Sequence, residues 1–132
     1  MNLEIDKKQV FASTAGKDFD PEKQTVFLLH GSGLSHIVWS LTEQFLSNKG
    51  LNILSLDLPG HGNSEGPCID SIEKIADWIE SVRLFLKIEK VSIVGHSQGC
   101  LEAFEYGSRF KKSIFKLVFL AGSYKMPVNQ DL

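Results

Sequence analysis

A serine lies between two glycines at the point where a short apolar run, beginning at Val91, changes into an amphipathic stretch. The pattern Gly95-His96-Ser97-Gln98-Gly99 predicts a strand, a tight turn and a helix, with the Ser97 hydroxyl projecting from the turn. A serine hydroxyl is a weak nucleophile, so a turn that aims a helix N-terminus at a reacting carbonyl favours its attack. We therefore expect Ser97 to be a nucleophile in acyl transfer.

The alternative for Ser97 is an ordinary helix N-cap behind a glycine turn. The apolar run before the motif and the helical pattern after it favour the nucleophile. Gly95 and Gly99 carry no side chain, which lets the strand and the helix approach each other. We expect Ser97 itself to have a strained backbone conformation.

Acyl transfer also needs N–H donors about 2.7 to 3.1 Å from the oxygen on which negative charge develops. The backbone amide of Gln98, directly after the nucleophile, is the first candidate. The second candidate is the amide of Ser32 in His30-Gly31-Ser32-Gly33, because Gly31 and Gly33 let that loop come close to a substrate. The alternative for this segment is a plain glycine-rich turn between a strand and a helix.

Four apolar runs are predicted to be strands, and three stretches with helical spacing alternate with them. The residues before Pro21 form a polar lead-in. The strands cover residues 25–29, 51–58, 91–94 and 115–121. The helices cover residues 35–49, 70–86 and 98–110, the first with an apolar stripe of Ile37, Val38, Leu41, Phe45 and Leu46 and a left-handed cap at Gly50. Asp70 is expected to cap the second helix, whose buried stripe is Ile72, Ile75, Ala76, Ile79, Val82 and Leu86.

This alternation predicts an α/β fold with a mostly parallel, twisted sheet and helices on both faces. Chemistry in such sheets lies at the carboxyl ends of the strands. The loops at His30, at His61 and at Ser97 all follow strands, so we expect them to meet at one edge and form a site.

Three motifs in this order resemble the α/β-hydrolase superfamily, in its serine-nucleophile branch. They are His30-Gly31-Ser32-Gly33, then Asp57-Leu58-Pro59-Gly60-His61-Gly62-Asn63-Ser64, and then the turn around Ser97. The resemblance covers about residues 24–123 and only the front half of a family member. It implies Ser97 as the nucleophile, with the Gln98 and Ser32 amides as oxyanion donors.

The resemblance assigns none of the four histidines to the role of general base. It implies that His30 is structural, that His61 shapes a loop beside the site, and that His96 points away from the Ser97 hydroxyl. His36 matches no catalytic position and is expected at the surface of a loop or a first helical turn. Asp57 is assigned to loop structure.

No histidine follows Ser97, whereas the family's base and its carboxylate lie in loops after later strands. Asp131 is a lone carboxylate near the terminus. We infer that residues 1–132 are a partial α/β-hydrolase core and that residues 124–132 begin a cap or linker. The strand ending at Ala121 would expose an apolar edge, which invites pairing with a complementary C-terminal half or self-association.

The leading functional hypothesis is a serine hydrolase that cleaves an acyl bond, most simply a carboxylic ester, without a cofactor or metal. Thioesterases, C–C bond hydrolases, aminopeptidases and acyltransferases of the same fold stay open. The rival class is an inactive fragment or a small-ligand-binding module. A phosphate-binding domain is disfavoured because the P-loop lysine pattern is absent. Without its base, this chain alone is predicted to be inactive or nearly so.

The charge, the apolar runs and the cysteines of the chain indicate which partners and which compartment to expect. A formal net charge of −2 gives no electrostatic reason to expect nucleic acid or an anionic membrane as a partner. The N-terminus lacks a signal-peptide pattern and no apolar run could cross a bilayer, so the cytoplasm is the expected compartment. Cys68 and Cys100 lie in unlike contexts, which predicts isolated thiols.

Overall fold

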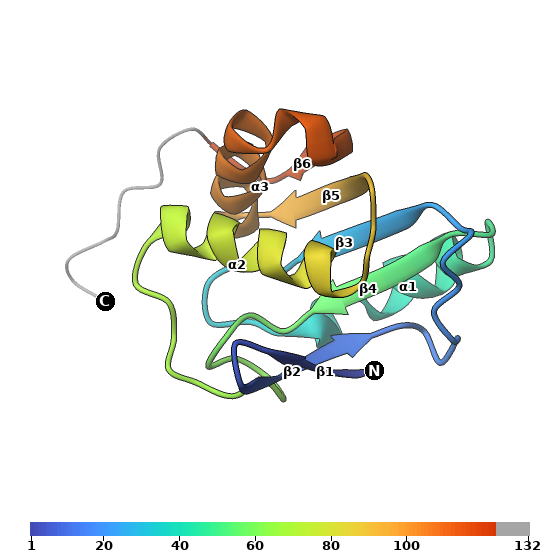
Figure 1. Ribbon diagram of the computed structural model, residues 1–132, viewed down its shortest axis with the longest axis horizontal. Helices are drawn as coiled ribbons and strands as arrows, with labels where there is room; N and C mark the ends of the chain where they lie inside the picture. The colour runs from blue at the N-terminus through green and yellow to red at the C-terminus, as the bar shows by residue number, and fades with distance from the viewer. Residues whose placement is uncertain (124–132) are drawn as a thin grey trace.

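Six strands form one sheet in the computed structural model, which describes residues 1–123 (Figure 1). Their order across the sheet is β1-β2-β4-β3-β5-β6, and β4, β3, β5 and β6 run parallel to one another. The predicted α/β class with a mostly parallel sheet is confirmed. The strands are β1 (Asn2–Ile5), β2 (Lys8–Ser13), β3 (Thr25–Leu29), β4 (Asn52–Leu56), β5 (Val91–His96) and β6 (Ile114–Leu120).

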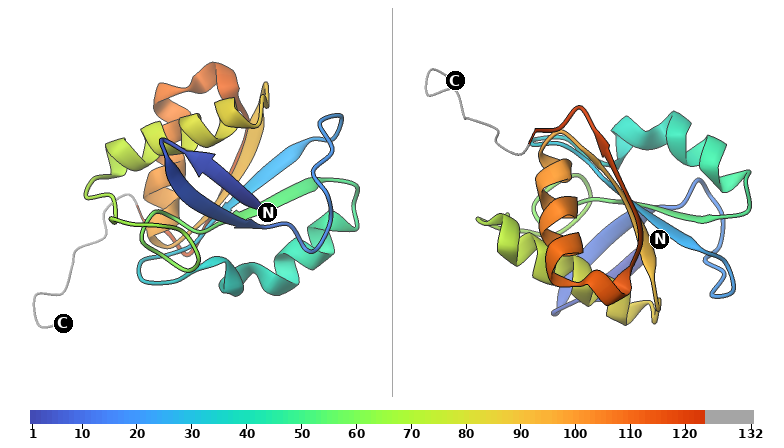
Figure 2. Two further views of the ribbon diagram at one scale, coloured as in Figure 1. Left: turned by 60° about the horizontal axis from the view of Figure 1, so that its bottom comes forward. Right: turned by 90° about the horizontal axis from the view of Figure 1, so that it is seen from above.

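Helices cover both faces of this sheet (Figure 2). The helices α2 (Ile72–Phe85) and α3 (Gln98–Arg109) lie on one face, and α1 (Ser40–Ser47) lies on the other. A 3₁₀ turn, η1 (His36–Trp39), leads into α1, and η2 (Lys111–Ser113) leads from α3 into β6. The central strand β3 is buried along its whole length because both of its faces are covered.

The polar lead-in predicted before Pro21 is wrong, because it contains a β-hairpin. Strands β1 and β2 pair antiparallel, and β2 continues onto β4. Asp6 and Lys7 form the two-residue turn with φ values of 50° and 63°. Turns of this kind favour Asn-Gly, so an Asp-Lys pair gives little signal in the sequence. The alternating apolar residues that face the core are Leu3, Ile5, Val10 and Ala12.

The apolar stripe predicted for the first helix is wrong at four of its five positions, and only Leu46 packs against the core. Ile37, Val38, Leu41 and Phe45 are exposed, and Leu41 keeps 83% of its surface accessible. The buried positions are Trp39, Glu43 and Ser47, which share the other face of η1 and α1. The Glu43 carboxylate accepts hydrogen bonds from the hydroxyls of Ser13 (2.7 Å) and Ser55 (2.6 Å), and this buried polar contact selects the inward face. Gly50 has the expected positive φ, although α1 already ends at Ser47.

The cap of α2 differs from the prediction by one residue. Ser71, and not Asp70, has the extended conformation of an N-cap, and its hydroxyl accepts a hydrogen bond from the Lys74 amide at 3.1 Å. Asp70 instead forms an exposed ion pair with the Lys74 ammonium at 2.7 Å. The apolar stripe predicted for this helix is buried at its four central positions, which are Ile75, Ala76, Ile79 and Val82.

Within residues 1–123, β6 is the last strand of the sheet, as expected from the sequence. Large apolar side chains stay exposed on it, namely Phe115, Val118, Phe119 and Leu120, and we call these four the β6 edge. The predicted cap or linker at residues 124–132, which includes Asp131, lies outside the described residues. Cys68 and Cys100 are free thiols, the first exposed and the second buried, as predicted.

Candidate active site

The junction between β5 and α3 has the geometry predicted for a nucleophile turn. Strand β5 ends at His96 and α3 begins at Gln98, so Ser97 alone makes the reversal. Its φ of 55° and ψ of −118° are strained for a residue with a side chain. Ser97 occupies the N-cap position, but its hydroxyl makes no capping hydrogen bond. The turn is therefore stabilised by contacts other than a capping hydrogen bond from Ser97.

The two glycines of the motif leave the space that this turn requires. A Cβ atom at position 95 would overlap the carbonyl group of Gly99. A Cβ at position 99 would lie 2.5 Å from the carbonyl oxygen of Leu29, at the end of β3. The first turn of α3 can therefore pack directly on the ends of β5 and β3, which fixes the position of Ser97.

The loop after β3 reaches the same place. Leu29 and Gly95 are partners in the parallel ladder, so the chain leaves both strands at one edge of the sheet. A Cβ at position 31 would lie only 3.1 Å from the Ser97 Cβ, which puts the Gly31 backbone against the nucleophile.

Both predicted oxyanion donors belong to these two segments. The backbone amides of Gln98 and Ser32 make no hydrogen bond within residues 1–123. Gln98 begins α3, where the N–H groups of the first turn have no acceptor within the helix. Their role as oxyanion donors, like that of Ser97 as a nucleophile, stays a prediction.

His30 is enclosed between the loops at the end of the sheet. Its ring is fully buried, with Nδ1 donating to the Gly31 carbonyl oxygen (2.8 Å) and Nε2 accepting from the Leu58 amide (3.2 Å). Burial lowers the pKa of His30, which favours the neutral ring that this pair of contacts needs. His30 therefore joins the loop after β3 to the loop after β4, as a structural histidine would.

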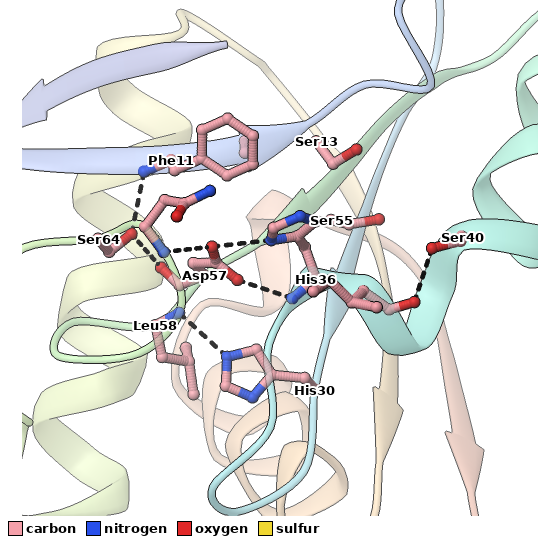
Figure 3. Close-up of polar contacts among 12 residues, drawn as sticks. Phe11, Ser13, His30, His36, Ser40, Ser55, Asp57, Leu58 and Ser64 are labelled. Atoms are coloured by element: carbon pink, nitrogen blue, oxygen red, sulfur yellow. Dashed lines mark hydrogen bonds and ion pairs between the residues drawn. The ribbon is translucent and has the colours of Figure 1, made fainter.

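His36 does not lie free at the surface, as the sequence analysis expected. Its Nδ1 lies 2.8 Å from Oδ2 of the buried Asp57, and its backbone amide donates to Oδ1 at 2.7 Å (Figure 3). The Asn63 amide donates to the same carboxylate at 2.9 Å. Asp57 thus organises both loops, which agrees with its predicted assignment to loop structure. No spacing rule in the sequence connects positions 36 and 57.

Ser64 completes the connection to the β-hairpin. Its hydroxyl donates to the Asp57 carbonyl oxygen at 2.7 Å and accepts from the Phe11 amide at 2.9 Å (Figure 3). The Phe11 ring lies tilted over the His36 ring, with 4.9 Å between the centroids. The hairpin that the sequence analysis missed therefore supports the loops of the site.

The other two histidines are also held away from the role of a base. His61 Nδ1 lies 3.1 Å from the Pro59 carbonyl oxygen, and its ring packs beside His30. His96 packs edge-on against Trp39, and its Nδ1 is buried without a hydrogen-bond partner. No described side chain is hydrogen-bonded to the Ser97 hydroxyl. Residues 1–123 therefore contain a nucleophile geometry and amide donors, but no base in contact with the serine.

One buried carboxyl group near the turn was not predicted from the sequence. Glu102 lies one turn into α3, is completely inaccessible to solvent, and accepts a hydrogen bond from the Gln98 side chain. A glutamate within a helical pattern is normally exposed, so the sequence does not indicate that this side chain is buried. Within the described part of the chain, no three His, Cys, Asp or Glu side chains gather as metal ligands. No helix there has the length and apolar content needed to span a membrane.

Residues 24–132 match the sequence profile of the family described as the alpha/beta hydrolase fold. The chain belongs to this family, and the resemblance drawn from the three motifs is confirmed. A crystal structure of a membrane phospholipase A has a TM-score of 0.85 at 20% identity, and the match covers 98% of this chain and 41% of that one. That likeness shows the fold alone.

Among curated relatives, two hydrolases illustrate the range of the family. The (E)-2-((N-methylformamido)methylene)succinate hydrolase of Acinetobacter baylyi is 29% identical over 105 residues, covering 79% of this chain and 40% of that protein. The 2-hydroxy-6-oxononadienedioate/2-hydroxy-6-oxononatrienedioate hydrolase of Paraburkholderia phymatum is 30% identical over 105 residues, covering 76% of this chain and 36% of that protein. The chain spans about a third to two fifths of the length of such relatives.

Proposed function

We propose that this chain carries the nucleophile and the oxyanion donors of a serine hydrolase that cleaves an acyl bond, most simply a carboxylic ester. The Ser97 backbone conformation at the end of β5 is the observation that carries the proposal. Ser97 Oγ attacks the acyl carbonyl, and the Gln98 and Ser32 amides stabilise the oxyanion. The general base takes the Ser97 proton during the attack and gives it to the leaving oxygen, so collapse of the intermediate expels the alcohol and leaves an acyl-enzyme, which water then hydrolyses.

The general base and its carboxylate are supplied by residues outside this chain. Support comes from the four histidines, each of which is hydrogen-bonded or packed elsewhere. A serine without a base keeps only the contribution of the oxyanion donors and of substrate binding, so the chain alone should turn over slowly. The names of its curated relatives favour hydrolysis without selecting the ester. The cytoplasmic location stays a prediction.

The test uses p-nitrophenyl acetate, with imidazole added as a soluble base. Without imidazole, we expect negligible turnover by the purified chain. With imidazole, we expect acetylation of Ser97, detected by mass spectrometry, because the added base can accept the serine proton.

The variant Ser97→Ala provides the control, since it removes only the hydroxyl oxygen and corrects for hydrolysis by imidazole itself. A failure of imidazole to promote acetylation at Ser97 would contradict the proposed nucleophile. Turnover well above buffer without imidazole, lost in Ser97→Ala, would contradict the missing base. Reversible ligand binding at this edge without any acylation would favour the binding module.

A further inference from the structure

Glu102 is a carboxyl group on the buried face of α3. The residues that share this buried face of α3 are Gly99, Ala103 and Tyr106, and Glu102 itself has 0% of its surface exposed. Burying a carboxylate is costly unless it gains hydrogen bonds or an opposite charge. Its contacts therefore indicate what keeps it there.

Within residues 1–123, the single hydrogen-bond partner of this carboxyl belongs to the proposed site. Glu102 Oε1 accepts a hydrogen bond from Gln98 Nε2 at 3.2 Å, across one turn of α3. Glu102 Oε2 is buried and has no hydrogen-bond partner in the described residues. Gln98 directly follows Ser97, and its backbone amide is the proposed oxyanion donor. The carboxyl is thus coupled to the first residue of the helix.

No charged group from the neighbouring elements pairs with Glu102. On α2, Glu80 binds Arg83 and Tyr106, and Asp77 binds Arg109. Glu73 and Lys74 are exposed at the start of α2. The titratable groups of the other packed elements are His30 after β3, His96 on β5, Lys116 on β6, and Lys111 and Lys112 on η2. None of them forms an ion pair with Glu102 in the described residues.

We propose that Glu102 is a positioning residue for the Ser97 site: its buried carboxylate holds the Gln98 side chain against the first turn of α3, and protonation weakens that hold. The consequence for Ser97 rests on the proposed function, whereas the contact with Gln98 does not. A hydrogen bond to an ionised carboxylate is stronger than one to a neutral carboxyl, which gives the contact its dependence on charge. Burial raises the pKa of Glu102 to about 7, so the change falls in the neutral range.

The test follows the side-chain amide resonances of Gln98 by NMR from about pH 5 to about pH 9, two units on either side of the expected midpoint. We expect an inflection near pH 7 in the native sequence. Glu102→Gln keeps an acceptor oxygen but cannot ionise, so the inflection should vanish while the fold persists. Ser97→Ala should keep the inflection. Absence of an inflection in the native sequence, or its persistence in Glu102→Gln, would overturn the proposal.

A second measurement links the contact to Ser97. Imidazole-assisted acetylation of Ser97 should slow about threefold to tenfold in Glu102→Leu, the loss expected when one hydrogen bond no longer holds a group. Glu102→Gln should restore most of the rate when the proteins are compared at pH 8, where the added imidazole is mostly neutral. Equal rates in all three proteins would refute the effect on Ser97. If no protein is acetylated while Gln98 still titrates, the proposed function fails and the positioning contact stands.

Discussion

Single residues explain why the site has its shape. Ser97 keeps a strained backbone because glycines on both sides let β5, α3 and the loop after β3 pack around it. The motif pattern was sufficient to predict this turn, since its glycines and serine are adjacent in sequence. The pairing of His36 with Asp57 and the burial of Glu102 could not be predicted, because both depend on contacts that only the folded chain creates.

Glu102 should also affect stability, with a sign set by its raised pKa. Its pKa rises from 4.5 to about 7 on folding, so between these values the folded chain binds more protons than the unfolded chain. Its contribution to the free energy of unfolding is fully present below pH 4.5 and is lost as the pH rises through about 7. The loss is about 3 kcal/mol as an upper value.

Urea unfolding at pH 5 and pH 8 measures this loss. Glu102→Gln should be less sensitive to pH than the native sequence over this interval. Glu4→Gln, at an exposed position on β1, should keep the native pH dependence. If the free energy of unfolding changes equally between pH 5 and pH 8 in all three proteins, Glu102 is ionised in the folded chain over this whole interval.

At the scale of elements, the sequence was most informative where both faces of a strand are buried. The continuous apolar runs predicted β3 and β4, which are buried along their whole length, within two residues of their observed ends. The helical spacing predicted α1, but the predicted buried face was wrong because the polar contacts of Glu43 outweigh the apolar stripe. The prediction failed for the β1–β2 hairpin because Asp6 and Lys7 adopt positive φ without the glycine that usually marks such turns.

The hairpin turn offers a direct test of this explanation. Lys7→Gly should increase the free energy of unfolding by about 0.5 to 1 kcal/mol, because glycine adopts a φ of 63° without strain. Lys8→Gly should decrease it, since Lys8 lies in the extended strand β2. Thermal unfolding followed by circular dichroism distinguishes the two variants. Equal destabilisation by both would argue against strain in the turn.

At the scale of the molecule, one surface is more apolar than a solvated sheet edge should be. The β6 edge exposes four large apolar side chains, with 43% of Val118 accessible. Unpaired apolar edges of this kind favour association with another polypeptide. We propose that a second copy of this chain covers the β6 edge.

The purified chain should therefore self-associate. Sedimentation velocity should show species larger than a monomer that grow with protein concentration. Val118→Lys places a charge on the β6 edge and should shift the chain toward the monomer. Leu84→Lys is the matched control, because Leu84 is an exposed apolar residue on α2. A native chain that is monomeric at every concentration would contradict the proposed association.

Labelling by a fluorophosphonate tests most directly whether the turn places Ser97 beside two oxyanion donors, because these donors should speed its reaction relative to that of an ordinary surface serine. When a triad member is missing, the oxyanion donors and substrate binding still accelerate the reaction about a thousandfold to ten-thousandfold over the reaction in water. Peptide mapping of the folded chain should therefore find the label on Ser97 well before it appears on the exposed Ser40. Urea should abolish this preference. Labelling of Ser97 that is no faster than that of Ser40, or unchanged by urea, would contradict the account.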